Sequence, residues 1–255
     1  MSDMFSAQSR VMEELRGMGR IPEYPITLSD PQQQAFLKLI LVALGEEVQE
    51  LDSAFKEFVE IHEKAPNERP NEESLARMAS DINEELCDCL AFTLEVLILL
   101  GVKKSELEFM IRALIRENNL DSLINGDLLD TIFNIATYQN AKIYLCPVVP
   151  AHYELPDNDI KPFLPAAVST MLPEGYETLI ADIYLAIFKL SHKLKANHWR
   201  QTKDEIKVPD LEADLVKLTL KIFQMVALFC YDSAVISEFF LKKANINLKR
   251  FRDGR

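Results

Sequence analysis

The sequence predicts an all-α protein, and three observations carry that prediction. Hydrophobic residues make up 48% of the 255 positions, which is enough for one large domain or two small ones. The chain contains only 7 glycines, and no stretch of useful length alternates apolar and polar residues as a β-strand does. Its apolar residues recur instead with the period of a helix, most clearly along residues 37–58.

The first predicted elements are a short helix and a long one. Residues 3–18 are expected to form an amphipathic helix, and the prolines that follow it give an extended link. Pro31 suits the first position of the long helix, where no backbone donor is needed, and Ser29 or Asp30 precedes it as the cap. The apolar stripe predicts that this helix continues to about Glu63.

Three more helices are expected before residue 140. A polar loop with two prolines ends at Asn71, which caps a second long helix that Gly101 stops. Ser105 is expected to cap the next helix, which ends near Asn118. A further helix is predicted over residues 128–138, where apolar residues again follow helical spacing.

The remainder of the chain is expected to hold a connector and three helices. Residues 147–173 contain six of the twelve prolines, so this stretch is predicted to be a linker or an ordered arm without a helix. The last three helices are predicted at residues 176–197, 211–229 and 235–250.

The two long helices of the first half carry carboxylates where core residues are expected. Glu47 and Glu50 lie three residues apart, as do Glu85 and Asp88, so each pair shares one helix face. Glu47 falls inside the apolar stripe, and Asp88 opens a run that is almost wholly apolar. Carboxylates gathered away from water repel one another unless cations neutralise them, and oxygen ligands in this number suit Mg²⁺ or Mn²⁺.

Simpler explanations exist for part of this pattern. Two carboxylates one turn apart are most often a solvated helix face, and acids such as Glu84 and Glu85 also favour the start of a helix through its dipole. Neither explanation covers Asp88 within an apolar run. The presence of two such pairs on adjacent long helices therefore favours a divalent-cation site.

An internal repeat relates the two halves of the chain. Residues 86–118 match residues 215–247 in apolar pattern at a constant offset of 129, without a gap, which indicates a duplication. In the repeat, Asp214 stands where the first copy has Glu85, and Lys217 stands where it has Asp88. The second copy has therefore lost half of this acidic pair.

The basic residues show the opposite distribution. Lys243, Asn247 and Arg250 lie on the last predicted helix, and the matching helix of the first copy has no such set. Basic residues near a helix C-terminus also favour its dipole, but that does not account for an opposing acidic cluster. We infer a pseudo-dimer with one complete site built from both halves. The expected division is a carboxylate-bearing half, a helix with its proline-rich connector, and a degenerate half with the basic motif, at residues 1–120, 121–173 and 174–255.

Three motifs in this order resemble a known family. The chain reads EEVQEL at residues 46–51, EELCDCL at 84–90 and FFLKKANINLKRF at 239–251. The pattern is similar to that of the all-α NTP pyrophosphatases, the superfamily of MazG and the dimeric dUTPases and dCTPases. One departure is that the third motif follows the degenerate repeat, whereas in most of the family it comes directly after the second motif.

The resemblance implies a helical bundle of the MazG or dUTPase type and a Mg²⁺-dependent enzyme. Its expected reaction is hydrolysis of a nucleoside triphosphate to the monophosphate and pyrophosphate, with Mn²⁺ as a possible substitute ion. By analogy Glu50 is the general base, and Lys243 and Arg250 neutralise charge on the departing pyrophosphate. Trp199 is a candidate for stacking on the base and equally well a packing residue. The implied metal ligands are Glu47, Glu50, Glu85 and Asp88, the catalytic residues Glu50 and Lys243, and the substrate-binding residues Lys243, Asn247, Arg250 and Trp199.

Charge and composition restrict the partners and the compartment. The net charge of −12 argues against binding to a nucleic acid backbone. It is uneven, because residues 1–170 hold 14 basic and 29 acidic residues whereas the remainder holds 14 and 11. No basic segment followed by an apolar run begins the chain, and no run reaches the length of a membrane span, so a cytoplasmic protein is expected. Cys87 and Cys89 lack metal-ligand spacing and are expected in the core.

Two other functions remain open from the sequence. The degenerate second half is compatible with a MazG-like fold that binds nucleotides or regulates a partner without catalysis. A helical scaffold that uses its acidic face for a basic partner is the third reading, and it predicts no stabilisation by Mg²⁺. The base and sugar preference stays open, as does pairing of the pseudo-dimer into a homodimer.

Overall fold

The computed structural model describes residues 2–64, 70–117, 130–132, 134, 173–194, 206–229 and 233–253. Throughout these ranges the regular elements are helices and none is a strand, which confirms the predicted all-α class. In chain order they are α1 (Ser2–Gly17), α2 (Pro31–Glu63), α3 (Glu72–Leu99), α4 (Lys104–Glu117), α6 (Pro173–Lys193), the short 3₁₀ helix η4 (Val208–Asp210), α7 (Glu212–Phe229) and α8 (Ser233–Arg252).

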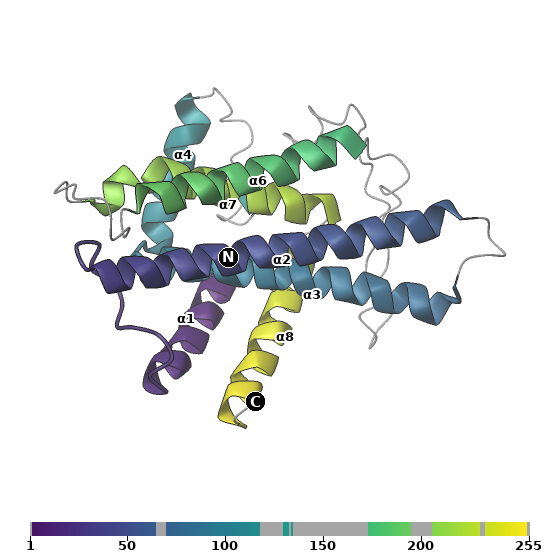
Figure 1. Ribbon diagram of the computed structural model, residues 1–255, viewed down its shortest axis with the longest axis horizontal. Helices are drawn as coiled ribbons and strands as arrows, with labels where there is room; N and C mark the ends of the chain where they lie inside the picture. The colour runs from purple at the N-terminus through teal and green to yellow at the C-terminus, as the bar shows by residue number, and fades with distance from the viewer. Residues whose placement is uncertain are drawn as a thin grey trace.

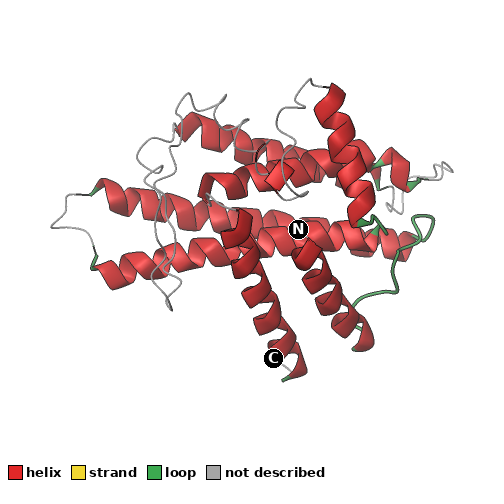
Figure 2. Cartoon of the chain, turned by 180° about the vertical axis from the view of Figure 1, so that it is seen from behind, coloured by secondary structure: helices red, strands yellow, loops and turns green. Residues whose placement is uncertain are grey.

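Two antiparallel helix pairs form the body of the molecule (Figure 1). The first hairpin consists of α2 and α3, and the second hairpin of α6 and α7. They stack on each other, with α6 against α2 and α7 against α3. Helices α1 and α8 contact each other and project together from the opposite side of the first hairpin, as the rear view also shows (Figure 2). The first hairpin is therefore the middle layer.

Capping residues set the ends of the first hairpin as predicted. The side chain of Asp30 accepts hydrogen bonds from two backbone N–H groups in the first turn of α2, so Asp30 rather than Ser29 is the cap. Asn71 caps α3 by accepting from the backbone N–H of Ser74. Gly101 follows α3 with a φ of 74°, a left-handed conformation that favours glycine and ends the helix.

The prediction that Ser105 caps α4 is wrong. The helix begins at Lys104, which places Ser105 inside its first turn. The carboxylate of Glu106 accepts instead from the backbone N–H of Lys103, at 2.8 Å. The acid three residues beyond Lys103 thus satisfies a donor at the helix start, which is the contribution of the acidic residue in a capping box.

One continuous hydrophobic core joins residues from both halves of the sequence. Three aromatic rings meet where the hairpins stack. Phe55 of α2 lies 4.7 Å from Tyr176 of α6 and 5.0 Å from Phe229 of α7, measured between ring centroids. Cys87 and Cys89 are buried, which confirms their expected place in the core.

The two hairpins bury the same pattern of positions. The buried residues of α2 recur in α6 at an offset of 139, from Leu37 matching Tyr176 to Phe55 matching Leu194. Those of α3 recur in α7 at the offset of 129, and so do those of α4 in α8. The contacts are reciprocal as well, because α8 packs on α3 and α4 packs on α7.

Several predicted features lie outside the described residues. They include most of the connector at residues 147–173, the end of the predicted helix near Asn118, and Trp199. In the ranges that the structure covers, no helix combines the length and apolar character needed to cross a membrane.

Candidate metal centre

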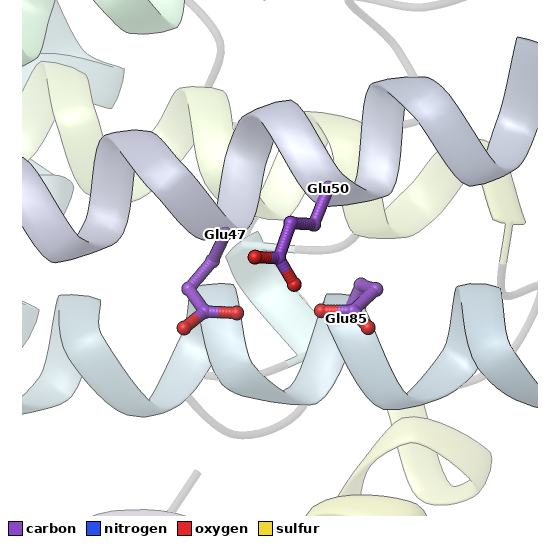
Figure 3. A group of neighbouring side chains, drawn as sticks. All are labelled: Glu47, Glu50 and Glu85. Carbon is purple, nitrogen blue, oxygen red and sulfur yellow. The ribbon is translucent and has the colours of Figure 1, made fainter.

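Three carboxylates converge between the helices of the first hairpin (Figure 3). Glu47 and Glu50 extend from α2 toward α3, and Glu85 extends from α3 toward them. One oxygen of each lies within 4.8 Å of the others. Glu47 and Glu85 are half-buried and Glu50 is exposed. We call these three residues the acidic group; its members come from two helices, as the sequence predicted.

Two members of the acidic group, Glu47 and Glu85, have raised pKa values. Partial burial, followed by the charges of Asp88, Glu85 and Glu50, raises the pKa of Glu47 from 4.5 to about 7. A hydrogen bond between the carboxyls of Glu47 and Glu85 contributes further. Burial and the neighbouring Asp88 and Glu50 also raise the pKa of Glu85. The negative charges of Glu47 and Glu85 are therefore incompletely compensated by the rest of the protein. A bound cation would compensate them in the same way as a proton does.

The backbone of α2 is supported beside the acidic group by the second hairpin. The hydroxyl of Tyr184, on α6, donates to the carbonyl oxygen of Gly45 at 3.3 Å. A Cβ atom at Gly45 would lie 3.8 Å from the ring of Tyr184, so the ring packs directly against this turn. Glu47 lies two residues further along α2, and its turn is thereby fixed from the side opposite α3.

Asp88, the fourth predicted metal ligand, faces a cation supplied by the chain. The Lys243 ammonium, on α8, lies 2.9 Å from the carboxylate of Asp88 and 3.1 Å from that of Glu84. Burial alone would lower the pKa of Lys243, but the hydrogen bonds and charges of Asp88 and Glu84 outweigh burial and raise it. Asp88 is thus close enough to raise the pKa of Glu47 and Glu85 while its own charge is shared with Lys243.

Packing on α3 and α1 positions Lys243. Ala244 and Phe240, on the same helix, are buried in the core. Further along α8, Arg252 forms two hydrogen bonds with the carboxylate of Glu14 on α1. The side chain of Lys243 is only 15% exposed, so its ammonium is held at the acidic cluster and does not extend into solvent.

The other predicted substrate residues lie less close to the acidic group. Asn247 is half-buried one turn beyond Lys243, and Arg250 is exposed almost one turn further along α8. Within the described part of the chain neither contacts the carboxylates. Both lie on the face of α8 that carries Lys243, because residues four and seven apart share a helix face. Trp199 is outside the described residues, so its position is untested.

The described residues of the second hairpin form no comparable acidic group. At the offsets that superimpose the buried positions, Ala186 and Lys189 replace Glu47 and Glu50. Asp214 and Lys217 replace Glu85 and Asp88, as the sequence comparison indicated. The four matched positions are Ala186, Lys189, Asp214 and Lys217.

Ion pairs within the chain join α6 to α7 instead. Lys193 lies 2.6 Å from the buried carboxylate of Asp214, and Lys221 lies 2.7 Å from Asp182. Ammonium groups therefore balance the carboxylates between these two helices.

Sequence reasoning grouped Glu85 with Asp88 and overlooked Glu84 as a partner of the basic motif. Glu84 and Asp88 are four residues apart and share a helix face, so one cation can bridge them. That spacing was the available signal, but the favourable effect of an acid near a helix start explained Glu84 without a partner. The choice of Lys243 depends on the packing of α8 against α3, which links residues 159 positions apart.

The pKa of Glu95, another acid of α3, is raised for a different reason from that of Glu47. Glu95 is buried, with 6% of its surface exposed, and burial alone raises its pKa from 4.5 to about 7. The side chain of Glu47 is less buried and its pKa rises to a similar value, because the charges of Asp88, Glu85 and Glu50 add to the effect of burial. The neighbouring carboxylates therefore distinguish Glu47 from Glu95.

The acidic group fits a hard divalent cation. Its donors are all carboxylate oxygens, they come within 4.8 Å of one another, and their mutual repulsion is relieved only by protons or cations. No protein-family model matches the chain, and no curated protein or solved structure matches it either. The case for function accordingly depends on the geometry of this site.

Proposed function

We propose that the protein is a Mg²⁺-dependent nucleoside triphosphate pyrophosphohydrolase, which converts a nucleoside or deoxynucleoside triphosphate to the monophosphate and pyrophosphate. The observation that carries this proposal is the convergence of Glu47, Glu50 and Glu85 beside Asp88, with Lys243 of α8 at its edge. A protein with a net charge of −12 needs local positive charge to bind a polyphosphate. At this site the carboxylates could hold divalent cations, and the ammonium of Lys243 lies next to them.

Glu47, Glu50, Glu85 and Asp88 would hold the divalent ions, which would supply Lewis-acid activation of the phosphate oxygens and of the attacking water. Glu50 is the exposed member of the acidic group, whereas Glu47 and Glu85 share a hydrogen bond. Glu50 is therefore best placed to accept the proton of a water molecule. The oxygen of that water bonds to the α-phosphorus while the bond from this phosphorus to the bridging oxygen breaks.

Pyrophosphate leaves with the electron pair of the broken bond, and positive charge must face it. Lys243 supplies an ammonium next to the acidic group, and Arg250 lies on the same face of α8. Asn247, between them, is positioned to donate to a phosphate oxygen or a sugar hydroxyl. Mn²⁺ is an alternative ion, because its preference for oxygen ligands is similar.

We also propose that the chain is a pseudo-dimer of two MazG-like halves. The support is the repeated burial pattern of the two hairpins and the reciprocal packing of α8 on α3 and of α4 on α7. This exchange brings the basic helix of the second half to the carboxylates of the first. The location in the cytoplasm and a further pairing of pseudo-dimers stay predictions.

The decisive assay is release of pyrophosphate from each ribo- and deoxynucleoside triphosphate with Mg²⁺ or Mn²⁺. Wild-type protein is expected to hydrolyse at least one of them, and Glu50→Gln to abolish the reaction. Glu46→Gln is the matched control, because Glu46 is an exposed acid of the same helix turn and is not one of the three residues whose oxygens converge.

Binding of a non-hydrolysable nucleotide with Mg²⁺ separates the main alternative from the enzyme. Wild-type protein that binds the nucleotide but turns over no triphosphate would replace the enzyme by a nucleotide-binding or regulatory module. The absence of both nucleotide and Mg²⁺ binding would leave the acidic face to a protein partner and would overturn the proposal.

A further inference from the structure

Lys243 has two carboxylate partners, and only one of them belongs to the predicted metal ligands. Its ammonium bridges Asp88, at 2.9 Å, and Glu84, at 3.1 Å. The side chain of Glu84 is 54% exposed, whereas that of Asp88 is 22% exposed and that of Lys243 is 15% exposed. The ammonium therefore lies between the more buried Asp88 and the exposed Glu84, at the boundary with solvent.

The helical geometry of α3 separates the roles of its three acids. Glu85 follows Glu84 by one residue and is rotated from it by about 100° around the helix axis, toward α2. Glu84 consequently stays outside the acidic group, although it is adjacent to Glu85 in sequence. Asp88 lies between the two directions, since it pairs with Lys243 and also acts on the carboxyls of Glu47 and Glu85.

Lys243 and a divalent cation compete for the charge of Asp88. An ammonium 2.9 Å from this carboxylate reduces the negative potential that attracts the ion, and the ion in turn repels the ammonium. With Asp88 as its sole acceptor, Lys243 would either oppose cation binding or leave the site. Glu84 offers a second acceptor that does not belong to the acidic group.

We propose that Glu84 is a positioning residue that keeps Lys243 at the site after Asp88 turns to a bound cation. This inference rests on the proposed function, because it assumes that divalent ions bind the acidic group. Glu84 touches neither the ions nor the substrate in this role and acts only through Lys243. It allows one ammonium to balance the acids in the absence of cations and to face the polyphosphate in their presence.

Mn²⁺ binding to the metal-free protein, measured by electron paramagnetic resonance, tests this role without turnover. Lys243→Met is expected to tighten Mn²⁺ binding, because a competing positive charge is removed. Glu84→Gln is expected to weaken it about three- to tenfold, because Lys243 then pairs with Asp88 alone. Glu46→Gln removes an equal charge without touching Lys243 and should weaken binding by less.

The double variant Glu84→Gln/Lys243→Met distinguishes a positioning role from a general effect of charge. Without Lys243, the effect of Glu84→Gln should shrink to that of Glu46→Gln. In the pyrophosphate assay Glu84→Gln should raise KM and lower kcat/KM, and Glu84→Asp should restore part of the loss.

The outcomes distinguish the two proposals. Wild-type protein that binds no Mn²⁺ would overturn the proposed function and this inference together. Binding by the wild-type protein, with an equal effect of Glu84→Gln in the presence and absence of Lys243, would overturn the role of Glu84 alone.

Discussion

The two hairpins bury matching positions and balance their charges in opposite ways. Between α2 and α3, three carboxyls converge, and burial and neighbouring carboxylates raise the pKa of two of them, Glu47 and Glu85. Between α6 and α7, Lys193 and Lys221 each neutralise a carboxylate of the facing helix. Among the described residues, no ammonium of α2 or α3 is paired with the acidic group, whereas carboxylates of the second hairpin have ammonium partners within it.

The comparison shows that packing and electrostatics are separable in this fold. The buried positions of α2 and α6 coincide from Leu37 and Tyr176 to Phe55 and Leu194, so the same apolar contacts support either arrangement. A few positions at the edge of this shared core carry the acidic group in one hairpin and ammonium-paired carboxylates in the other. Changes at these positions should alter function in the first hairpin and stability in the second.

The largest expected effect is on turnover, in the first hairpin. Glu50→Gln removes the carboxylate proposed to accept the proton from water, and we expect the rate of pyrophosphate release to fall about 10²- to 10⁴-fold. Circular dichroism should show an unchanged fold, because Glu50 is exposed. Retention of more than a tenth of the wild-type rate would show that Glu50 is not the base.

Glu95 sharpens the comparison, because its pKa is raised without a cluster. In the wild-type protein the folded state keeps the proton of Glu95 up to about pH 7, and the unfolded state loses it near 4.5. The contribution of Glu95 to stability is therefore fully present below about pH 4.5 and is lost as the pH rises toward 7. Glu95→Gln should be more stable than wild type by about 3 kcal/mol at pH 8 and equally stable at pH 4.5.

Urea denaturation across this pH range measures the effect at Glu95. Mg²⁺ should leave the difference between wild type and Glu95→Gln unchanged. In contrast, it should cancel any gain from Glu47→Gln, which also removes a proton-binding acid but belongs to the acidic group. Equal responses of both variants to Mg²⁺ would contradict the distinction between a cluster and an isolated buried acid.

In the second hairpin, loss of a lysine should reduce stability. Lys193→Met leaves the carboxylate of Asp214, which is 12% exposed, without its ammonium. We expect the free energy of unfolding to fall by about 1–2 kcal/mol, because Lys193 itself is 43% exposed and part of its interaction is screened. Lys217→Met on α7 is the control, since Lys217 is exposed and forms no ion pair within the described chain. Recovery of stability on addition of Mg²⁺ would show that this hairpin also binds cations.

The smallest expected change per pH unit is that of the cation affinity. A cation must displace the proton of Glu47, whose pKa is raised to about 7 by burial and neighbouring carboxylates. Mn²⁺ affinity should rise with pH by up to about tenfold per unit below pH 7 and then level off. The slope should flatten in Glu47→Gln and persist in Glu46→Gln. An affinity independent of pH between 5 and 7 would show that Glu47 is not a ligand.

Local chemistry made much of the first hairpin predictable from the sequence. Proline after a capping acid, asparagine before α3 and glycine after it each satisfy backbone groups at a helix end, and they set the bounds of α2 and α3 to within a few residues. The placement of Glu47 within an apolar stripe likewise indicated that it faces a neighbouring helix. At Ser105 a local rule failed, because Glu106 provided a competing acceptor for the backbone.

The ion-pair partners of the charged residues could be identified only from the tertiary structure. Nothing local to α8 indicates that Lys243 bridges Asp88 and Glu84, because that contact depends on how α8 crosses α3. The ion pair of Lys193 with Asp214 likewise depends on how α6 and α7 are aligned. The residue types show which side chains are acidic and which are basic. The packing of the helices determines which of them form ion pairs.

Mn²⁺ binding to the metal-free protein tests the central claim most directly, with Glu47→Gln/Glu85→Gln compared with Glu46→Gln. The account predicts that the wild-type protein and Glu46→Gln bind the ion, and that the double variant loses binding while keeping its helical circular dichroism. Equal Mn²⁺ binding by all three proteins, or none by the wild type, would contradict the assignment of the acidic group as a cation site.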